Sequence, residues 1–256
     1  MEEQSIVVTN NEQRCCIHIK VECPLEELGD ITQLKLRRTS DASSNEKILI
    51  QKEVSDVAEL SFEYDDLETV CGVTYTYYII MSDEEDMAVR SGFASAKCQF
   101  SGICIADEDT SWKTAFGTSA NQYSEAYKRT RQVQYVTTLS GKFPHRVSNS
   151  AANYTTGSCT GWWIPLGGRC SEPVITGNAD LYRDAFIDFL ANGKDKLLRT
   201  SNGKAMIVSI DGEIQENWNP RTELTTVTFS WTQIGEIDRP TYTNPNPGWT
   251  REEVTL

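Results

Sequence analysis

Apolar and polar side chains alternate along much of the first hundred residues, which is the pattern of strands with one buried face. In residues 33–39, Leu34 and Leu36 alternate with Lys35 and Arg37. Five further strands are expected by the same reasoning, at residues 14–21, 47–54, 59–64, 73–81 and 87–100. Polar or turn-forming residues separate these runs. Short strands at this spacing predict an antiparallel β-sandwich in the first part of the chain.

A helical pattern is clear in residues 178–192. Apolar side chains four residues apart form two adjacent rows, Leu181, Ala185 and Phe189 in one and Tyr182, Phe186 and Leu190 in the other. The two rows make a single apolar stripe, and we expect Arg183, Asp184 and Asp188 to point away from it. Gly193 suits the left-handed conformation that ends many helices. The sequence therefore predicts one amphipathic helix laid on a β-rich body.

The chain after residue 101 is also rich in strand patterns, many of them polar. Expected strands lie at residues 103–106, 122–127, 131–139, 146–147, 154–165 and 225–234, and residues 196–198 and 205–210 form a hairpin about the turn 201–203. The fold class is therefore mainly β, with a β-sandwich over residues 1–101 and a β-rich α+β domain over residues 102–238. Residues 239–256 contain three prolines and predict an extended C-terminal arm.

The net charge of −13 is unevenly distributed along the chain. Residues 1–101 hold 20 acidic and 9 basic side chains, whereas residues 102–256 hold 17 and 15. The acidic first part argues against nucleic-acid binding there. No apolar run is long enough to span a bilayer, and residues 1–13 are too polar for a signal peptide. We therefore expect a protein made in a cytosol, with neither nucleic-acid binding nor membrane insertion.

Metal binding and catalysis find little support in the sequence. Cys15 and Cys23 would lie about 26 Å apart on one strand, too far to share a metal ion, and no Cys-x-x-Cys pair occurs. The eight cysteines are therefore expected to be reduced and mostly buried. Cys159 or Cys170 with His145 is the one nucleophile–base pairing to consider, and a structural thiol is favoured over it. Residues 107–109 read as a solvated acidic turn. We expect no catalytic residue, metal or cofactor, and no enzyme activity.

Four aromatic residues are candidates for binding. Trp162 and Trp163 are adjacent on an expected strand and face opposite ways, so at most one of them can stack on a sugar. Burial of one and packing of the other in an interface is the favoured interpretation. Tyr242 and Trp249 are anchors for packing on a neighbouring subunit, with a disordered tail as an equally weighted alternative.

A resemblance to fibronectin type III domains rests on a leucine followed by a Gly-x-Thr-Tyr-x-Tyr run. These residues are Leu67 and then Gly72, Thr74, Tyr75 and Tyr77. The resemblance implies that Tyr75 is the residue of a tyrosine corner, its hydroxyl bonded to nearby backbone.

The second part of the chain resembles a family of phage tail proteins, the distal-tail or baseplate type. The matching features are residues 132–139 followed by Gly141-Lys142-Phe143-Pro144, residues 153–158, the helix end 189–193, the runs 196–198 and 206–208, and the closing residues 229–231. A preceding type III module occurs in relatives from prophages and tail-like particles. The resemblance implies a non-enzymatic structural component of a tail tip or baseplate.

The same resemblance implies partners and a location. Copies of the chain would form a ring, commonly six-fold, that joins the tail tube to the adsorption apparatus and contacts neighbouring tail-tube and baseplate proteins. The protein would be made in the cytoplasm of the bacterial host and end in the tail of the virion. Sheet edges and the C-terminal arm would hold the ring together. The alternative is a carbohydrate-binding or host-adsorption module, using Trp162 or Trp163.

Overall fold

The computed structural model describes residues 5–237 except 13, 27, 84–87, 91, 108–114, 138, 140–141, 165–178 and 221–223. The C-terminal arm, with Tyr242 and Trp249, therefore lies outside the described residues. The mainly β fold class is confirmed, with one α-helix in the part described. The chain divides into two compact units: unit 1 contains Met1–Ser101 and Arg199–Ala205, and unit 2 contains Gly102–Leu198 and Met206–Leu256.

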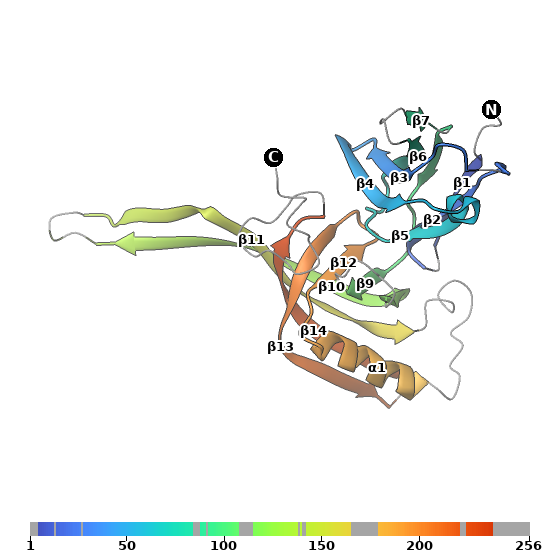
Figure 1. Ribbon diagram of the computed structural model, residues 1–256. Coiled ribbons are helices and arrows are strands. Elements are labelled where there is room, and N and C mark those ends of the chain that lie inside the picture. Colours follow the sequence, from blue (N-terminus) through green and yellow to red (C-terminus); the bar gives the residue numbers. More distant parts are fainter. Residues whose placement is uncertain are drawn as a thin grey trace. The chain divides into compact units, whose positions relative to one another are not determined.

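Unit 1 contains two antiparallel sheets. One has the order β1-β2-β5, from β1 (Ser5–Asn11), β2 (Cys16–Glu22) and β5 (Phe62–Asp66). The other has the order β4-β3-β6-β7 with β8 also on β6, from β3 (Gln33–Ser40), β4 (Ser43–Glu53), β6 (Thr74–Ser82), β7 (Ala88–Arg90) and β8 (Ala94–Lys97). This strand order is that of a β-sandwich in which β4 pairs with β3 and belongs to the same sheet (Figure 1).

Three details of unit 1 differ from the sequence prediction. Residues 87–100 were expected to form one strand, but they contain two short ones, β7 and β8, which pair with different parts of β6. Strand β1 was not expected, because its alternation of exposed and half-buried residues involves few large apolar side chains. Residues 59–64 were expected to form one strand, but Val57–Leu60 forms a 3₁₀ turn before β5. The turn arises because Asp56 and Glu59 make a capping box, each side chain accepting from backbone N–H groups at the turn.

The alternating positions of unit 1 form its core, as expected. Ile17 and Ile19 of β2, Leu34 and Leu36 of β3, and Ile79 of β6 are fully buried. The backbone N–H of Val70 donates to the hydroxyl oxygen of Tyr75 over 2.9 Å, which is the bond that the tyrosine corner requires. Tyr75 therefore joins the start of β6 to the loop that precedes it.

A buried ion pair lies beside this corner. A guanidinium nitrogen of Arg38 is 2.7 Å from Asp66 Oδ2, and both side chains are almost completely inaccessible. Tyr77 Oη donates to the same carboxylate over 2.9 Å, and the N–H of Glu68 donates to its other oxygen. Burial opposes the charge of Arg38, but the nearby carboxylates outweigh burial and raise its pKa. Because these groups satisfy one another, the charge can remain in the sandwich interior.

We predict that Tyr75→Phe destabilises the protein by about 1–3 kcal/mol, because the Val70 N–H loses its acceptor in a part-buried position. Chemical denaturation monitored by circular dichroism measures the change. Tyr135→Phe is the matched control, since Tyr135 is exposed, and should change the free energy of unfolding very little. Equal stability of the two variants would contradict a structural role for the Tyr75 hydroxyl.

Unit 2 is built around a closed antiparallel barrel with the order β10-β11-β14-β13-β12-β9. Its strands are β9 (Ile103–Asp107), β10 (Ala115–Val136), β11 (His145–Ile164), β12 (Lys196–Thr200), β13 (Ala205–Asn219) and β14 (Leu224–Gly235). Four short strands were expected between residues 122 and 165, but these form only two very long ones, β10 and β11. The turn between β12 and β13 was predicted correctly and has Gly203 at φ +84°.

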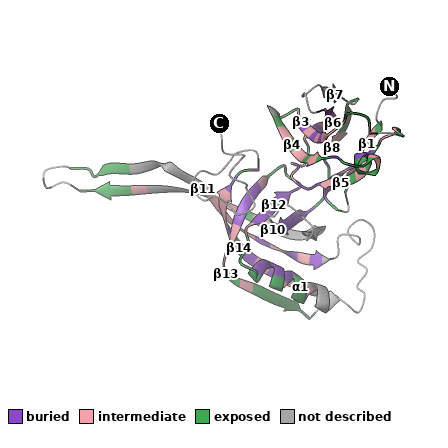
Figure 2. Ribbon diagram, viewed as in Figure 1, coloured by how far each residue is buried: buried purple, intermediate pink, exposed green. Residues whose placement is uncertain are grey.

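The single described helix, α1 (Ala179–Ala191), ends as predicted, with Gly193 at φ +75°. Its buried residues are Phe186, Phe189 and Leu190. Ala185 is exposed, so the apolar stripe is narrower than predicted (Figure 2). Arg183 was expected to point away from the apolar stripe, but it contacts the barrel. Its Nε lies 2.9 Å from a carboxylate oxygen of Glu216, and a terminal nitrogen donates a hydrogen bond to the Thr225 hydroxyl. The side chains of Leu181 and Tyr182 lie outside the described part.

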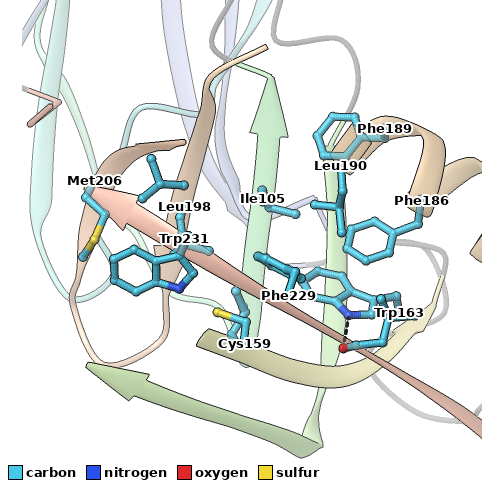
Figure 3. Close-up of a cluster of buried hydrophobic side chains, with 13 residues drawn as sticks. Ile105, Cys159, Trp163, Phe186, Phe189, Leu190, Leu198, Met206, Phe229 and Trp231 are labelled. Carbon is cyan, nitrogen blue, oxygen red and sulfur yellow. Dashed lines mark hydrogen bonds between the residues drawn. The ribbon is translucent and has the colours of Figure 1, made fainter. Parts of the chain in front are cut away.

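The core of unit 2 joins this helix to the barrel (Figure 3). Trp163 of β11 stacks on Phe186 of α1, with ring centroids 4.1 Å apart, and both rings approach Phe229 of β14. Trp231 lies further along β14 and covers Gly157, its register partner on β11. A Cβ placed on Gly157 would overlap both the Trp231 ring and the carbonyl oxygen of Ala126. Glycine is therefore required at this close approach.

We predict that Gly157→Ala lowers the stability of unit 2 by about 1–3 kcal/mol, because the added methyl group has no room between Trp231 and β10. Thermal unfolding followed by tryptophan fluorescence measures the shift. Gly92→Ala serves as the control, since a Cβ there meets open space. A Gly157→Ala protein that unfolds at the wild-type temperature would show that the Trp231 packing is wrong.

Candidate assembly surface

Strands β10 and β11 continue well beyond the barrel. Strand β9 pairs with β10 only at residues 115–117, and β14 pairs with β11 only at residues 156–161. Lys128 pairs with Thr156, so from this point outward the described residues of the two strands pair only with each other. We call residues 128–155 the ribbon; it is drawn in yellow-green in Figure 1 and projects from the barrel.

The outer end of the ribbon exposes large apolar side chains on both faces. Leu139 is fully exposed, and Phe143 and Tyr135 are 73% and 69% exposed. Val136 and Val147 are about half exposed. Five of the nine exposed large apolar side chains in the described structure lie in this short segment. Figure 2 shows described parts of the outer ribbon in green, the colour of exposed residues. Such concentration on one projecting element is typical of an interaction surface.

The ribbon also differs in charge from the rest of the protein. It contains five basic residues, Lys128, Arg129, Arg131, Lys142 and Arg146, and no acidic residue. The remaining residues hold 19 Lys and Arg and all 37 Asp and Glu, a net charge of −18. The sequence prediction missed this surface, although the absence of any carboxylate over 28 residues is visible in the sequence.

Beyond Thr155, whose N–H donates to the side chain of Gln233, no third strand of the described residues pairs with the ribbon. A two-stranded hairpin is marginally stable in water without a third strand or a packed face. Its two outer edges present rows of N–H and C=O groups, which readily pair with another chain. The described part of the ribbon therefore combines open strand edges with exposed apolar side chains, and both features are typical of interaction surfaces.

The two candidate sugar-binding residues occupy different environments. Trp163 is buried in the core of unit 2, and its Nε1 donates to the backbone oxygen of Val227. The stacking of Trp163 on Phe186 occupies one face of its ring. Trp162 is half-buried, so any stacking on sugar depends on Trp162.

The candidate thiol–imidazole pair is not assembled. Cys159 and His145 lie on the same strand, β11, fourteen residues apart, which separates them by about 45 Å. Cys159 is buried, and burial raises the pKa of its thiol to about 12. Such a thiol is protonated at neutral pH and is not a nucleophile. Cys170 lies outside the described residues.

Five of the seven described cysteines are buried, and we predict that they resist alkylation in the native protein at pH 8. Cys23 and Cys71 are half-buried and should react first. Burial raises the pKa of Cys16 to about 12, as it does for Cys159, so these two should be among the slowest. Iodoacetamide labelling with mass spectrometry of the peptides measures each site. Fast labelling of Cys159 in folded protein would contradict this placement.

A buried polar cluster lies where α1 meets the barrel. Lys196 Nζ donates to Asp107 Oδ1 over 2.6 Å and to Asn192 Oδ1, and the amide of Asn192 donates to Asp107. The Phe189 ring centroid is 4.5 Å from Lys196 Nζ. Burial lowers the pKa of Lys196, although Asp107 opposes this change. These groups use their hydrogen bonds on one another, so the cluster fixes the end of the helix.

This cluster corrects the prediction of a solvated turn at residues 107–109. Asp107 is the last residue of β9, and its side chain is buried. The burial of this carboxylate is possible because Lys196 supplies the opposite charge. Glu108 and Asp109 lie outside the described residues. Within the described part, no three His, Cys, Asp or Glu side chains gather as metal ligands. The described helix is neither long nor apolar enough to cross a membrane.

Comparison with known proteins gives no family. No family model matches the sequence, and no curated protein matches it. Pectate lyase Pel3 from Pectobacterium carotovorum aligns with 12% identity and a TM-score of 0.29, over 37% of this chain and 26% of that one. Titin kinase with its flanking domains aligns with 11% identity and a TM-score of 0.28, over 91% and 37%. This chain thus spans about a quarter to a third of those chains, and likenesses at these scores establish no shared fold or function.

Proposed function

We propose that this protein is a non-enzymatic structural component of the tail tip or baseplate of a phage or phage-tail-like particle. Copies of it would form a ring between the tail tube and the adsorption apparatus. The observation that carries the proposal is the ribbon, with two open edges and an apolar end that the described residues leave uncovered. Residues 132–144 and 153–158, which resemble tail proteins, lie largely in this ribbon.

The shape of the ribbon suits contact between copies. A projecting element that docks on a different surface of the next copy makes a heterologous contact, and such contacts close into rings when the rotation allows. The contact is repeated at every subunit, so modest affinity at each ribbon is enough for a stable assembly. The barrel and helix supply a rigid base, because the base of the ribbon is anchored where Gly157 packs beneath Trp231.

A shortened ribbon tests this proposal. Arg129 and Thr155 are register partners, so residues 130–154 can be replaced by a two-residue asparagine–glycine turn without disturbing the barrel. We predict that the full chain sediments as an oligomer and that the shortened chain is a folded monomer. Analytical ultracentrifugation gives the mass, and thermal unfolding checks that the barrel persists.

The matched control removes exposed apolar side chains elsewhere. Val7 and Ile48 are about half exposed on unit 1, so Val7→Ser with Ile48→Ser changes surface hydrophobicity without touching the ribbon. This variant should keep the wild-type mass. A shortened chain that assembles like the full chain would contradict the ribbon as the assembly surface.

A further inference from the structure

We infer that the ribbon of one copy docks on the acidic residues 1–101 of a second copy, with its basic side chains on carboxylates and its apolar end buried between them. The inference rests on the proposed function, in that it requires assembly between copies, and it identifies the surface that receives the ribbon. It rests on the separation of charge along the chain, on the exposed basic side chains of Lys128, Arg129, Lys142 and Arg146, and on the apolar residues beside them.

The charge of the ribbon selects its partner within the second copy. Residues 1–101 have a net charge of −11, whereas residues 102–256 outside the ribbon hold 17 acidic and 10 basic side chains, a net of −7 over a longer stretch. The strongest negative charge per residue is therefore in residues 1–101. On this unit the side chains of Glu22 and Glu63 are 61% and 62% exposed on neighbouring strands β2 and β5, although Glu22 is paired with Lys20 and Glu63 lies near His18. Opposite charges of this kind speed the encounter and fix its orientation.

Contact between two ribbons is disfavoured. Each ribbon has five basic residues and no carboxylate, so pairing two of them would bring ten positive charges together with no carboxylate of their own to offset them. Like charges placed opposite one another are strongly unfavourable across an interface. The ribbon therefore needs an anionic surface, and the rest of the same protein provides one.

A protein surface fits the ribbon better than nucleic acid does. Contact with phosphates would not stabilise the exposed aliphatic side chains of Val136, Leu139 and Val147. Their burial against another protein would be favourable, because it removes apolar surface from water. Lys142 Nζ is 5.7 Å from the ring centroid of Phe143, so cation and apolar surface occur together at the end of the ribbon. This mixture matches an acidic protein surface.

Zero-length cross-linking of the full chain tests the inference. A carbodiimide joins lysine amines to carboxylates, and the ribbon offers the amines of Lys128 and Lys142 but no carboxylate. In a mixture of unlabelled and ¹⁵N-labelled chains, we expect isotopically mixed cross-links from Lys142 to Asp or Glu of residues 1–101. Lys142→Arg keeps the charge and should assemble normally while losing these cross-links.

A charge reversal supplies the energetic test. Lys142→Glu should weaken self-association on the order of tenfold and reduce its sensitivity to salt, measured by sedimentation equilibrium. Lys97→Glu makes the same change on exposed β8 of unit 1 and should not weaken it. Assembly that persists without cross-links to residues 1–101, or that ignores Lys142→Glu, would overturn the inference while leaving the proposed function intact.

Two other outcomes would count against the inference. A chain that stays monomeric at all concentrations would contradict both the inference and the proposed function. A duplex DNA oligonucleotide that binds the full chain through the ribbon, and dissociates the copies, would replace the acidic protein partner with nucleic acid.

Discussion

Two strands that pair only with each other leave the N–H and C=O groups of their outer edges without a strand partner. The assembly proposed for this protein follows from that constraint. In the described residues between 130 and 154, β10 and β11 pair with each other and with no third strand. The apolar side chains at the far end have no core to enter. Water can form hydrogen bonds with the exposed backbone groups, but the exposure of the apolar side chains of Leu139 and Phe143 to water is unfavourable. The assembly contact that we propose would cover both the strand edges and these side chains.

The barrel holds the ribbon by packing at its base. Strands β10 and β11 enter the barrel as part of a core in which Trp163, Phe186 and Phe229 contact one another. At the point of exit, the backbone of β11 lies directly against the Trp231 ring, which only glycine at position 157 allows. The helix end is fixed separately by the Asp107–Lys196 contact. A rigid base of this kind gives the ribbon a defined direction, which an assembly contact requires.

Much of the fold could be predicted from local patterns. Alternation located most strands of the sandwich, and the resemblance to fibronectin type III domains implied a hydrogen bond of Tyr75 that the structure contains. The helix and the glycine that ends it follow equally from short-range rules. The length of β10 and β11 could not be predicted, because strands exposed on both faces show no alternation. The Arg38–Asp66 and Lys196–Asp107 pairs were also missed, since they join residues far apart in the sequence.

Hydrogen exchange of the backbone amides in residues 129–136 and 145–155 tests the central claim most directly, because it reports whether the outer edges of the ribbon are covered. The measurement compares a dilute sample with a concentrated one and uses the barrel amides as an internal reference. The account predicts fast exchange in the ribbon when the protein is dilute and strong protection when it is concentrated, with little change in the barrel. Fast exchange in the ribbon at every concentration at which the protein is an oligomer would contradict it.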